Sequence, residues 1–248
     1  MLVAKSTTIS VEGTPIGWCR LRDIRGVRRQ VRVGASDPSL TAVAGIVAVT
    51  ELVSRLRTIE SPNSAVGPIK QRNRGHGAGE LLVGLAAVQL AGEDFLVGVD
   101  RHRGDTVGQV LTPVPDLVST TAAGLAHRFT PEQWVAVETG VAAVSQRMLA
   151  LLPAPRAAVL TEGTVTIDID APDVEVYGRK KRGVDYNHVG QRCGRPHVAS
   201  WAEAGTVLAA ELLCGRDDPR SYVAALFRRA LAALPAAARN GAKVAPAC

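Results

Sequence analysis

The sequence predicts a mixed α/β (α+β) fold in two successive parts, an all-helical domain over residues 37–153 and a strand-rich domain over residues 154–248. In the first part, apolar residues recur at helical spacing, most clearly over residues 40–56. After Pro153 the pattern changes, and runs rich in β-branched residues follow, most clearly over residues 165–176. This change of period sets the predicted domain boundary.

Residues 1–36 precede the helical domain and form a basic leader. Six arginines lie between positions 20 and 32 of this leader, against one acidic residue, Asp23. Alternation at Val31 and Val33 predicts a short strand within it. The leader is either an extended basic arm that contacts DNA or a solvated loop or pairing strand, and the sequence favours neither.

The sequence pattern in the first half of the helical domain predicts two helices separated by a polar loop. Asp37 suits an N-cap and Pro38 a first helical position, so a helix should begin there and continue to about residue 56. Residues 60–79 are rich in Pro, Gly, Asn and basic residues, which predicts a loop. The glycine-rich end of this loop lacks the Lys and Ser or Thr of a phosphate-binding loop, so we interpret it as the start of a helix over about residues 78–91.

Two further helices are predicted near the end of the helical domain. The first covers about residues 120–128, and the second begins at Thr130, with Pro131 in its first turn and Gln133 completing a capping box. Two helices joined by a tight turn are compatible with a helix-turn-helix in which Arg128 contacts DNA. Simple packing of two helices is the more common explanation of such a pair.

The strand-rich domain is expected to contain several strands followed by one helix. Its β-prone segments are residues 158–160, 165–176, 196–201 and 206–213. Residues 202–205 form a hairpin turn between the last two segments, and residues 223–234 form an amphipathic helix. Three adjacent strands followed by a helix are the opening of a ribonuclease H-like mixed sheet, so the prediction is an incomplete first half of that fold.

Composition narrows the class of protein and its partners. The 248 residues are 46% hydrophobic and 21% charged, which is typical of a globular rather than a disordered chain. A formal net charge of +6 favours a polyanionic partner, usually nucleic acid. The four cysteines are widely spaced and match no zinc-binding pattern. Because no apolar run suits a signal peptide or a membrane span, we expect a cytoplasmic protein without a membrane partner.

Four acidic residues within eight positions form the most distinctive feature of the chain: Asp168, Asp170, Asp173 and Glu175. Side chains alternate along a strand, so Asp168 and Asp170 should point to the same face. Acidic residues are depleted in strands, and several together suggest a site for a hard cation such as Mg²⁺. The alternative is an edge strand with a solvated acidic face.

A basic, glycine-rich stretch follows the acidic segment directly. Its cations are Arg179, Lys180, Lys181, Arg182, Arg192 and Arg195. One acidic residue, Asp185, lies among them, and Tyr186 and His188 are interleaved. Cations and aromatic residues beside a metal site suit a nucleic-acid backbone, so we predict that the six cations bind DNA. A charged hairpin without a ligand is the alternative.

The residues of these two segments resemble those of a known family. The strings 165–170, 173–178 and 190–199 are similar to bacterial insertion-sequence transposases of the type described as transposase DDE domain, group one. Residues 96–105 and 119–126 also resemble the N-terminal region of that family. The resemblance therefore covers roughly residues 36–235.

The resemblance implies a ribonuclease H-like catalytic domain in which two Asp and one Glu hold two Mg²⁺ (or Mn²⁺) ions for strand cleavage and transfer. It assigns Asp170, with Asp168 as the neighbouring alternative, as the first catalytic and metal-binding carboxylate. It also implies the DNA ends of an insertion element as the main partner. An intact transposase or a second copy of the chain would be a further partner. The expected location is the bacterial cytoplasm, in association with the nucleoid.

The sequence departs from the family pattern in two places. Pro172 stands two residues after Asp170, where the family usually has Thr, and proline is poorly suited to a central strand. We therefore expect the strand to be distorted there. No acidic residue follows Asp218, so the second Asp and the Glu are expected to be missing, as in a truncated transposase. The resulting prediction is a transposase-derived chain that is catalytically inactive.

Two other hypotheses stay open. One is a DNA-binding remnant that interferes with an intact transposase through its helical domain and basic segments. The other is an unrelated metal-dependent nuclease whose site consists of the four acidic residues at positions 168–175 alone.

Overall fold

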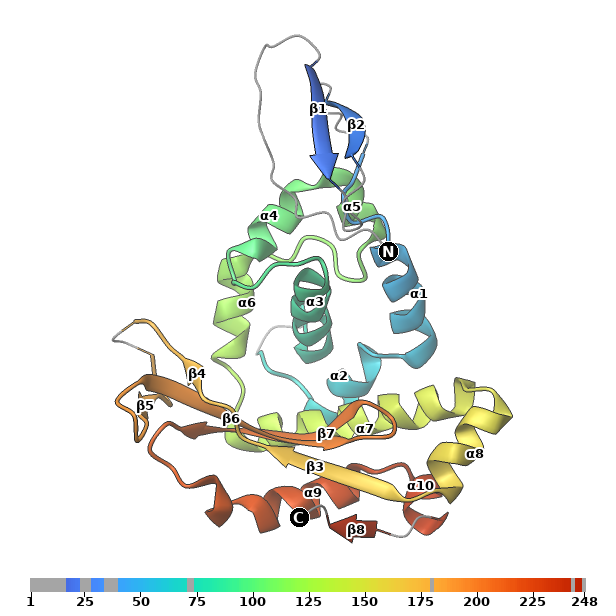
Figure 1. Cartoon of the computed structure of the whole chain (residues 1–248), viewed down its shortest axis with the longest axis vertical. Helices are drawn as coiled ribbons and strands as arrows, with labels where there is room; N and C mark the ends of the chain where they lie inside the picture. The colour runs from blue at the N-terminus through green and yellow to red at the C-terminus, as the bar shows by residue number, and fades with distance from the viewer. Residues whose placement is uncertain are drawn as a thin grey trace.

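Helices and strands occupy separate parts of the chain. The computed structural model describes residues 17–22, 28–33, 40–70, 74–178, 181–241 and 244–246. Between residues 40 and 162 these are mostly helical, and from residue 165 they form mainly antiparallel strands with a helix near the C-terminal end (Figure 1). The predicted mixed fold, helices followed by a sheet, is therefore confirmed. Within these described ranges no helix is long and apolar enough to cross a membrane.

The described residues of the helical region contain eight helices. They are α1 (Ile46–Leu56), α2 (Glu60–Val66), α3 (Ala78–Leu90), α4 (Gly98–Gly104), α5 (Thr106–Leu111), α6 (Ser119–Ala126), α7 (Pro131–Leu151) and α8 (Ala154–Glu162). The start of α7 has the predicted capping box. The Thr130 hydroxyl accepts a hydrogen bond from the backbone N–H of Gln133 at 3.2 Å, and the Gln133 side chain accepts one from Thr130 N–H at 3.1 Å.

An apolar cluster holds the helical region together around α3. Five apolar residues of this helix are buried, and Leu81 among them is fully buried. Val99 of α4 and Ala122 and Leu125 of α6 belong to the same cluster, as does Phe129 after α6. Figure 1 accordingly shows α3 in the middle of the helical region.

The prediction of a loop over residues 60–79 was wrong for its first part, which forms α2. Ser61 and Pro62 of α2 are buried. They pack against Gly140 of α7, where an added Cβ would lie only 2.8 Å from the Pro62 Cα. Packing against α7 thus stabilises a short helix that is too short to be stable alone. The sequence pattern carries no sign of this distant contact.

The prediction of strand at residues 158–160 was also wrong, because these residues belong to α8. Leu160 is buried in the core, and the Thr161 hydroxyl donates to the Ala157 carbonyl at 3.0 Å, as in a helix. Three residues are too few to distinguish a period of two from a period of 3.6. Within the described residues the first helix begins at Ile46, because residues 40–45 form coil and turn. The expected cap at positions 37 and 38 lies outside the described residues.

The described strands of the C-terminal region form one mixed sheet. They are β3 (Val165–Asp170), β4 (Val174–Glu175), β5 (Asp185–Tyr186), β6 (Arg192–Trp201), β7 (Thr206–Cys214) and β8 (Val244–Pro246). Strand β6 is central, with β3 antiparallel on one side and β7 antiparallel on the other. Strand β8 pairs in parallel with β3. The predicted hairpin turn between β6 and β7 is confirmed, and Gly205 there has a φ of 62°.

Part of the basic leader also forms a sheet. Strands β1 (Gly17–Arg22) and β2 (Arg28–Val33) pair antiparallel with each other. For these two segments the alternative of a pairing strand is therefore correct. The rest of the leader, residues 1–16, 23–27 and 34–36, lies outside the described residues.

Helix α9 (Val223–Ala233) covers the sheet as predicted, after a short 3₁₀ turn, η1 (Pro219–Ser221), and before α10 (Ala236–Gly241). Leu226 and Ala230 of α9 are fully buried. They share a core with Trp201 of β6, Leu149 of α7 and Leu160 of α8. Residues from both parts of the chain therefore close this core.

Helix α7 runs between the other helices and the sheet (Figure 1). A charged network ties α7 to strand β7 and to helix α9. Arg229 of α9 contacts Glu138 of α7 at 2.9 Å and Glu211 of β7 at 2.7 Å. The Ala210 N–H donates to Glu138, and the Ala210 carbonyl accepts from Arg229. These two side chains thus satisfy backbone groups on the outer edge of β7, which would otherwise be open to another strand.

Candidate metal and nucleic-acid binding site

Asp168 and Asp170 share one exposed face of β3, as the sequence predicts. Val165 and Ile167 are buried on the opposite side, because alternate residues of a strand point to opposite faces. Asp168 pairs with Ser200 of β6, so both acids lie beside the central strand. The Asp170 carboxylate accepts a hydrogen bond from Ala171 N–H at 2.8 Å. Within the described part of the chain, neither carboxylate forms an ion pair.

The strand breaks after Asp170, where Pro172 predicted a distortion. Strand β3 ends at Asp170, and β4 resumes along the same edge of β6 at Val174. Proline has no N–H to donate to the ladder, so pairing with β6 is interrupted around it. Asp170 therefore stands at the end of a strand, next to an irregular segment.

Asp173 and Glu175 have different surroundings from the first two acids. Asp173 accepts a hydrogen bond from Arg195 at 2.7 Å and another from the Asn187 amide at 2.8 Å. Glu175 accepts one from the Tyr177 hydroxyl at 2.6 Å. No three His, Cys, Asp or Glu residues come together in a metal-binding arrangement among the residues that the structure describes. The four acids are therefore not brought together as one site.

Arg195 holds the pKa of the Asp173 carboxyl at about 2, below its ordinary value of 3.8. The hydrogen bond from the guanidinium is the largest cause, and the bond from Asn187 adds to it, because both favour the charged carboxylate. Burial, with a contribution from nearby Asp173, raises the pKa of the Cys193 thiol. This cysteine is therefore not an activated nucleophile.

Asn187 organises the loop beside this pair, a role that the sequence analysis missed. Its side-chain oxygen accepts hydrogen bonds from Val189 N–H at 3.1 Å and Gln191 N–H at 2.9 Å. Gly190 has a φ of 80°, which completes the turn. An Asn followed three residues later by Gly is a turn signal in the sequence and could have indicated this loop.

The predicted DNA-binding cations of the basic stretch fall into three groups. Arg179 and Lys180 lie outside the described residues, and Lys181 and Arg182 are exposed. Arg192 instead donates to the carbonyls of Gly178 and Lys181, at 2.6 Å and 3.2 Å.

Arg195 belongs with Arg192, because it too has protein partners. Besides its bond to Asp173, it donates to the Asp217 carbonyl at 2.6 Å, and its side chain is only 11% exposed. These two guanidinium groups hold neighbouring segments of the sheet together. DNA binding by Arg192 and Arg195 stays a prediction, and the geometry favours Lys181 and Arg182 as the contacts.

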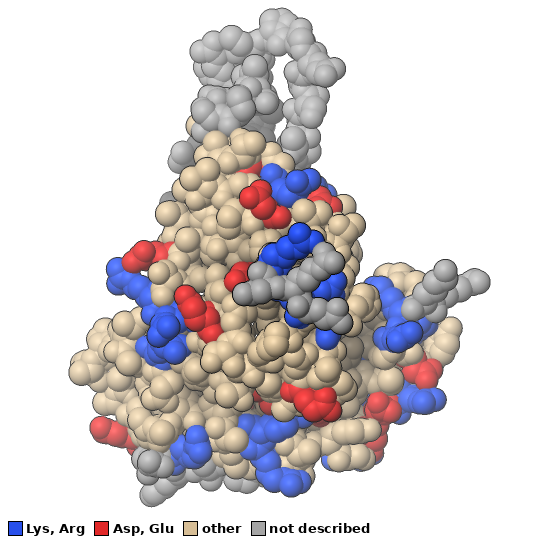
Figure 2. All heavy atoms as spheres, turned by 180° about the vertical axis from the view of Figure 1, so that it is seen from behind, with Lys and Arg blue, Asp and Glu red and all other residues tan. Residues whose placement is uncertain are grey.

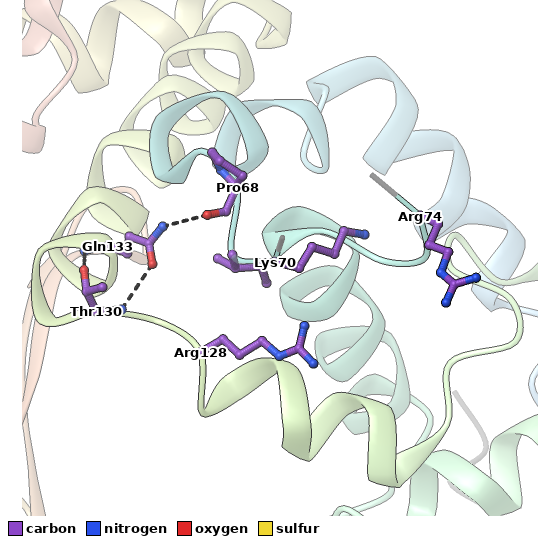
Figure 3. Close-up of a pocket in the computed structure, with 7 residues that line it drawn as sticks. Pro68, Lys70, Arg74, Arg128, Thr130 and Gln133 are labelled. Atoms are coloured by element: carbon purple, nitrogen blue, oxygen red, sulfur yellow. Dashed lines mark hydrogen bonds between the residues drawn. The ribbon is translucent and has the colours of Figure 1, made fainter. Parts of the chain in front are cut away.

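Arg128 lies at the end of α6, beside a basic pocket that the sequence did not indicate. The pocket has a volume of about 870 Å³ and is lined by Pro68, Ile69, Lys70, Arg74, Arg128, Thr130 and Gln133. Figure 3 shows the side chains of Arg128 and Arg74 reaching toward this space from the end of α6 and from the loop before α3. Lys70 lies between them in the same view. From the sequence, residues 60–79 were predicted only to form a polar loop.

The arrangement of α6 and α7 does not suit a helix-turn-helix with α7 as the recognition helix. Helix α7 packs against α2 on one side and against β7 and α9 on another. Its single basic residue, Arg147, donates to the Leu56 carbonyl at 3.2 Å and to the Ser61 hydroxyl at 2.5 Å. A recognition helix needs a free face with side chains that reach base edges. Simple helical packing therefore explains this pair.

Comparison with known proteins yields no match for this chain, whether with protein-family models, with curated proteins or with solved structures. The resemblance to the DDE transposases accordingly stays a prediction.

Proposed function

We propose that the chain is of the DDE transposase type, with a ribonuclease H-like sheet that binds DNA and a divalent cation. The observation that carries the proposal is the position of Asp168 and Asp170. They are exposed, unpaired by any described cation, and lie at the end of the strand where that family places its first metal ligand. A strand normally carries few acids, so two on one exposed face favour a binding role.

The order of the strands supports a ribonuclease H-like arrangement. Strands β3, β6 and β7 follow one another as antiparallel neighbours, and α9 and α10 then lead to β8. Strand β8 returns beside β3 and is parallel to it. The resemblance implies three adjacent strands, a helix and then a further strand, and β8 takes the place of that further strand. Residues at the carboxyl end of β3 would then lie at the usual ligand-binding edge of such a sheet.

Asp168 and Asp170 fit a Mg²⁺ or Mn²⁺ ion that shares its coordination with water and DNA. Mg²⁺ is usually bound through one or two carboxylates, with waters and substrate phosphates completing its shell. Both carboxylates are open to solvent, which leaves room for these other ligands. When bound, such an ion would polarise a phosphate group of DNA. The chain's own residues would hold the cation and, through Lys181 and Arg182, the backbone next to it.

The proposal includes binding but not strand transfer by this chain alone. Two-ion chemistry on DNA uses a clamp that stabilises both the attacking and the leaving oxygen. Among the described residues no third His, Cys, Asp or Glu joins Asp168 and Asp170 in a metal-binding arrangement, and Asp173 is held by Arg195 and Asn187. We propose insertion-element ends as the DNA partner, and the bacterial cytoplasm as the location.

A cation-binding experiment tests the proposal directly. Mn²⁺ would be titrated into the full chain by electron paramagnetic resonance, with and without a 30-base-pair duplex. We expect Mn²⁺ to bind more tightly when DNA is present. We also expect the Mn²⁺ affinity of Asp168→Asn/Asp170→Asn to be at least about tenfold weaker than that of the wild type, since the carboxylates supply the charge that holds the ion. Asp94→Asn is the matched control, because Asp94 is an exposed acid in the helical region.

Two results would contradict the proposal. One is Mn²⁺ affinity that is the same in the double variant and the control. The other is the absence of any binding to duplex DNA. Joining of DNA ends by the wild-type chain would contradict the narrower claim that strand transfer is lacking.

Interference with an intact transposase is a second function that the same observations allow. It needs the chain to bind DNA without cleaving it, and the exposed cations Lys181 and Arg182 favour such binding. A nuclease that uses the four acids of residues 168–175 alone is not proposed, because the structure does not bring them together.

A further inference from the structure

We propose that the pocket lined by Lys70, Arg74 and Arg128 binds the phosphate groups of a DNA backbone. The pocket is in the helical region, away from the acidic face of β3, and its identity as a DNA site rests on the proposed function. Its residues come from two separate segments, the loop between α2 and α3 and the junction of α6 and α7. The fold therefore creates this basic concavity, which no local sequence motif shows.

Charge is the first argument for an anionic ligand. Of the seven described residues that line the pocket, three are cations and none is acidic. Neither Lys70, Arg74 nor Arg128 forms an ion pair with any residue in the described part of the chain. The whole loop over residues 67–77 contains no Asp or Glu. Cations that converge without a counter-charge raise the local concentration of anions.

The walls of the pocket are held in place, which is the second argument. The Gln133 amide donates to the carbonyls of Val66 and Pro68, both at 3.2 Å, and so ties the start of α7 to the loop. Ile69 is buried in the helical core. The Lys70 ammonium donates to the carbonyls of Gly75 and His76 and closes the loop on itself. The base of the loop is thus fixed before any ligand arrives.

The other wall is equally well supported. Phe129, next to Arg128, is buried and stacks on Trp134, with ring centroids 4.2 Å apart. This pair fixes the backbone at the end of α6. Arg128 itself is exposed and free to turn toward a ligand. A preformed site loses less conformational entropy on binding than one that must first be ordered.

The lining indicates which part of a nucleic acid enters. None of the described residues that line the pocket is aromatic, so they offer no surface on which a base could stack. Arginine and lysine are the usual partners of phosphate oxygens, and such contacts position a protein without reading sequence. A volume of about 870 Å³ is larger than one phosphate needs, which suits successive groups of a backbone. Figure 2 shows Lys and Arg atoms grouped near the middle of the face seen there.

The test compares Arg74→Ala/Arg128→Ala with the wild-type chain in binding to a fluorescent 30-base-pair duplex. Lys70 is left unchanged because it also closes the loop. Each phosphate contact contributes about 0.9 to the slope of log K against log salt concentration, so the slope should fall by about 2 and affinity at 0.1 M salt by roughly 50-fold. Arg103→Ala, at an exposed residue of α4 outside the pocket, is the matched control and should leave both the slope and the affinity unchanged within error.

Other variants and ligands separate the possible failures. Unchanged slope and affinity in the double variant, with DNA binding lost in Lys181→Ala/Arg182→Ala, would overturn this inference and leave the proposed function standing. Loss of inorganic phosphate binding by calorimetry without any effect on DNA would mean a small-anion site instead. A pocket effect on RNA alone would also overturn it. Circular dichroism and thermal melting must show that each variant is folded like the wild type.

Discussion

Asp168 and Asp170 differ from their neighbours Asp173 and Glu175 in whether another side chain forms a hydrogen bond to the carboxylate. The first two are exposed on β3 without a described cationic partner. Asp173 is bound by Arg195 and Asn187, and Glu175 by Tyr177. All four lie within eight residues of sequence, yet only Asp173 is held by side chains that are distant in the chain. A carboxylate already held by arginine stabilises the fold, whereas one left open can bind a metal ion.

The largest effect on stability should come from removing Arg195, which donates a hydrogen bond to Asp173. Arg195→Ala is expected to lower the free energy of unfolding by about 2 kcal/mol, because the mostly buried Arg195 side chain and its charge-assisted hydrogen bond to Asp173 are both lost. The Asp217 carbonyl loses its donor as well. Urea unfolding of the full chain measures the change.

Arg220→Ala is the matched control for that prediction. Arg220 pairs with Asp218, but its side chain is 90% exposed, so no measurable loss of stability is expected. Equal losses in the two variants would contradict the idea that burial separates structural pairs from solvated ones.

A smaller effect should appear in the pH dependence of stability. The pKa of Asp173 is lowered to about 2, so its stabilising contribution is fully present above an unfolded-state value of 3.8. It is lost as the pH falls from about 4 through about 2. The expected size is roughly 1 kcal/mol, because a quarter of the side chain remains in contact with screening solvent.

The measurement is the difference in unfolding free energy between the wild type and Asp173→Asn over pH 2 to 6. Asparagine does not titrate, so the difference should shrink as the pH falls below about 4. A difference that stays constant over this range would show that the Arg195 bond does not depend on the charge of Asp173.

The sequence was sufficient for features that depend on neighbours in the chain. The capping box at Thr130 and Gln133, the hairpin turn ending at Gly205 and the strand break at Pro172 are local, and the structure has all three. The alternation of Asp168 with buried Ile167 also follows from the strand period alone. Local backbone preferences are enough to specify such features.

Features that depend on distant contacts could not be predicted in this way. Helix α2 exists because Pro62 packs on Gly140, nearly eighty positions later. The basic pocket requires Arg128 to meet a loop some fifty residues earlier in the chain. Arg195 resembled its basic neighbours in sequence, and only the register of β6 places it beside Asp173. Long-range pairing, rather than residue type, separates structural from free charges in this molecule.

The smallest effect should come from the open acids themselves. Asp168→Asn/Asp170→Asn is expected to unfold at the same temperature as the wild type, within experimental error, when metal and DNA are absent. Neither carboxylate has a cationic partner in the described structure, and the Asp170 bond from Ala171 N–H can be kept by an asparagine oxygen. Like charges on one strand face do not stabilise each other. Duplex DNA should stabilise both proteins, but adding Mn²⁺ to the DNA complex should stabilise the wild type further and not the double variant, because only a bound ligand shifts unfolding by mass action. If the double variant instead lost as much stability as Arg195→Ala, both pairs of acids would be structural, and the contrast between them would disappear.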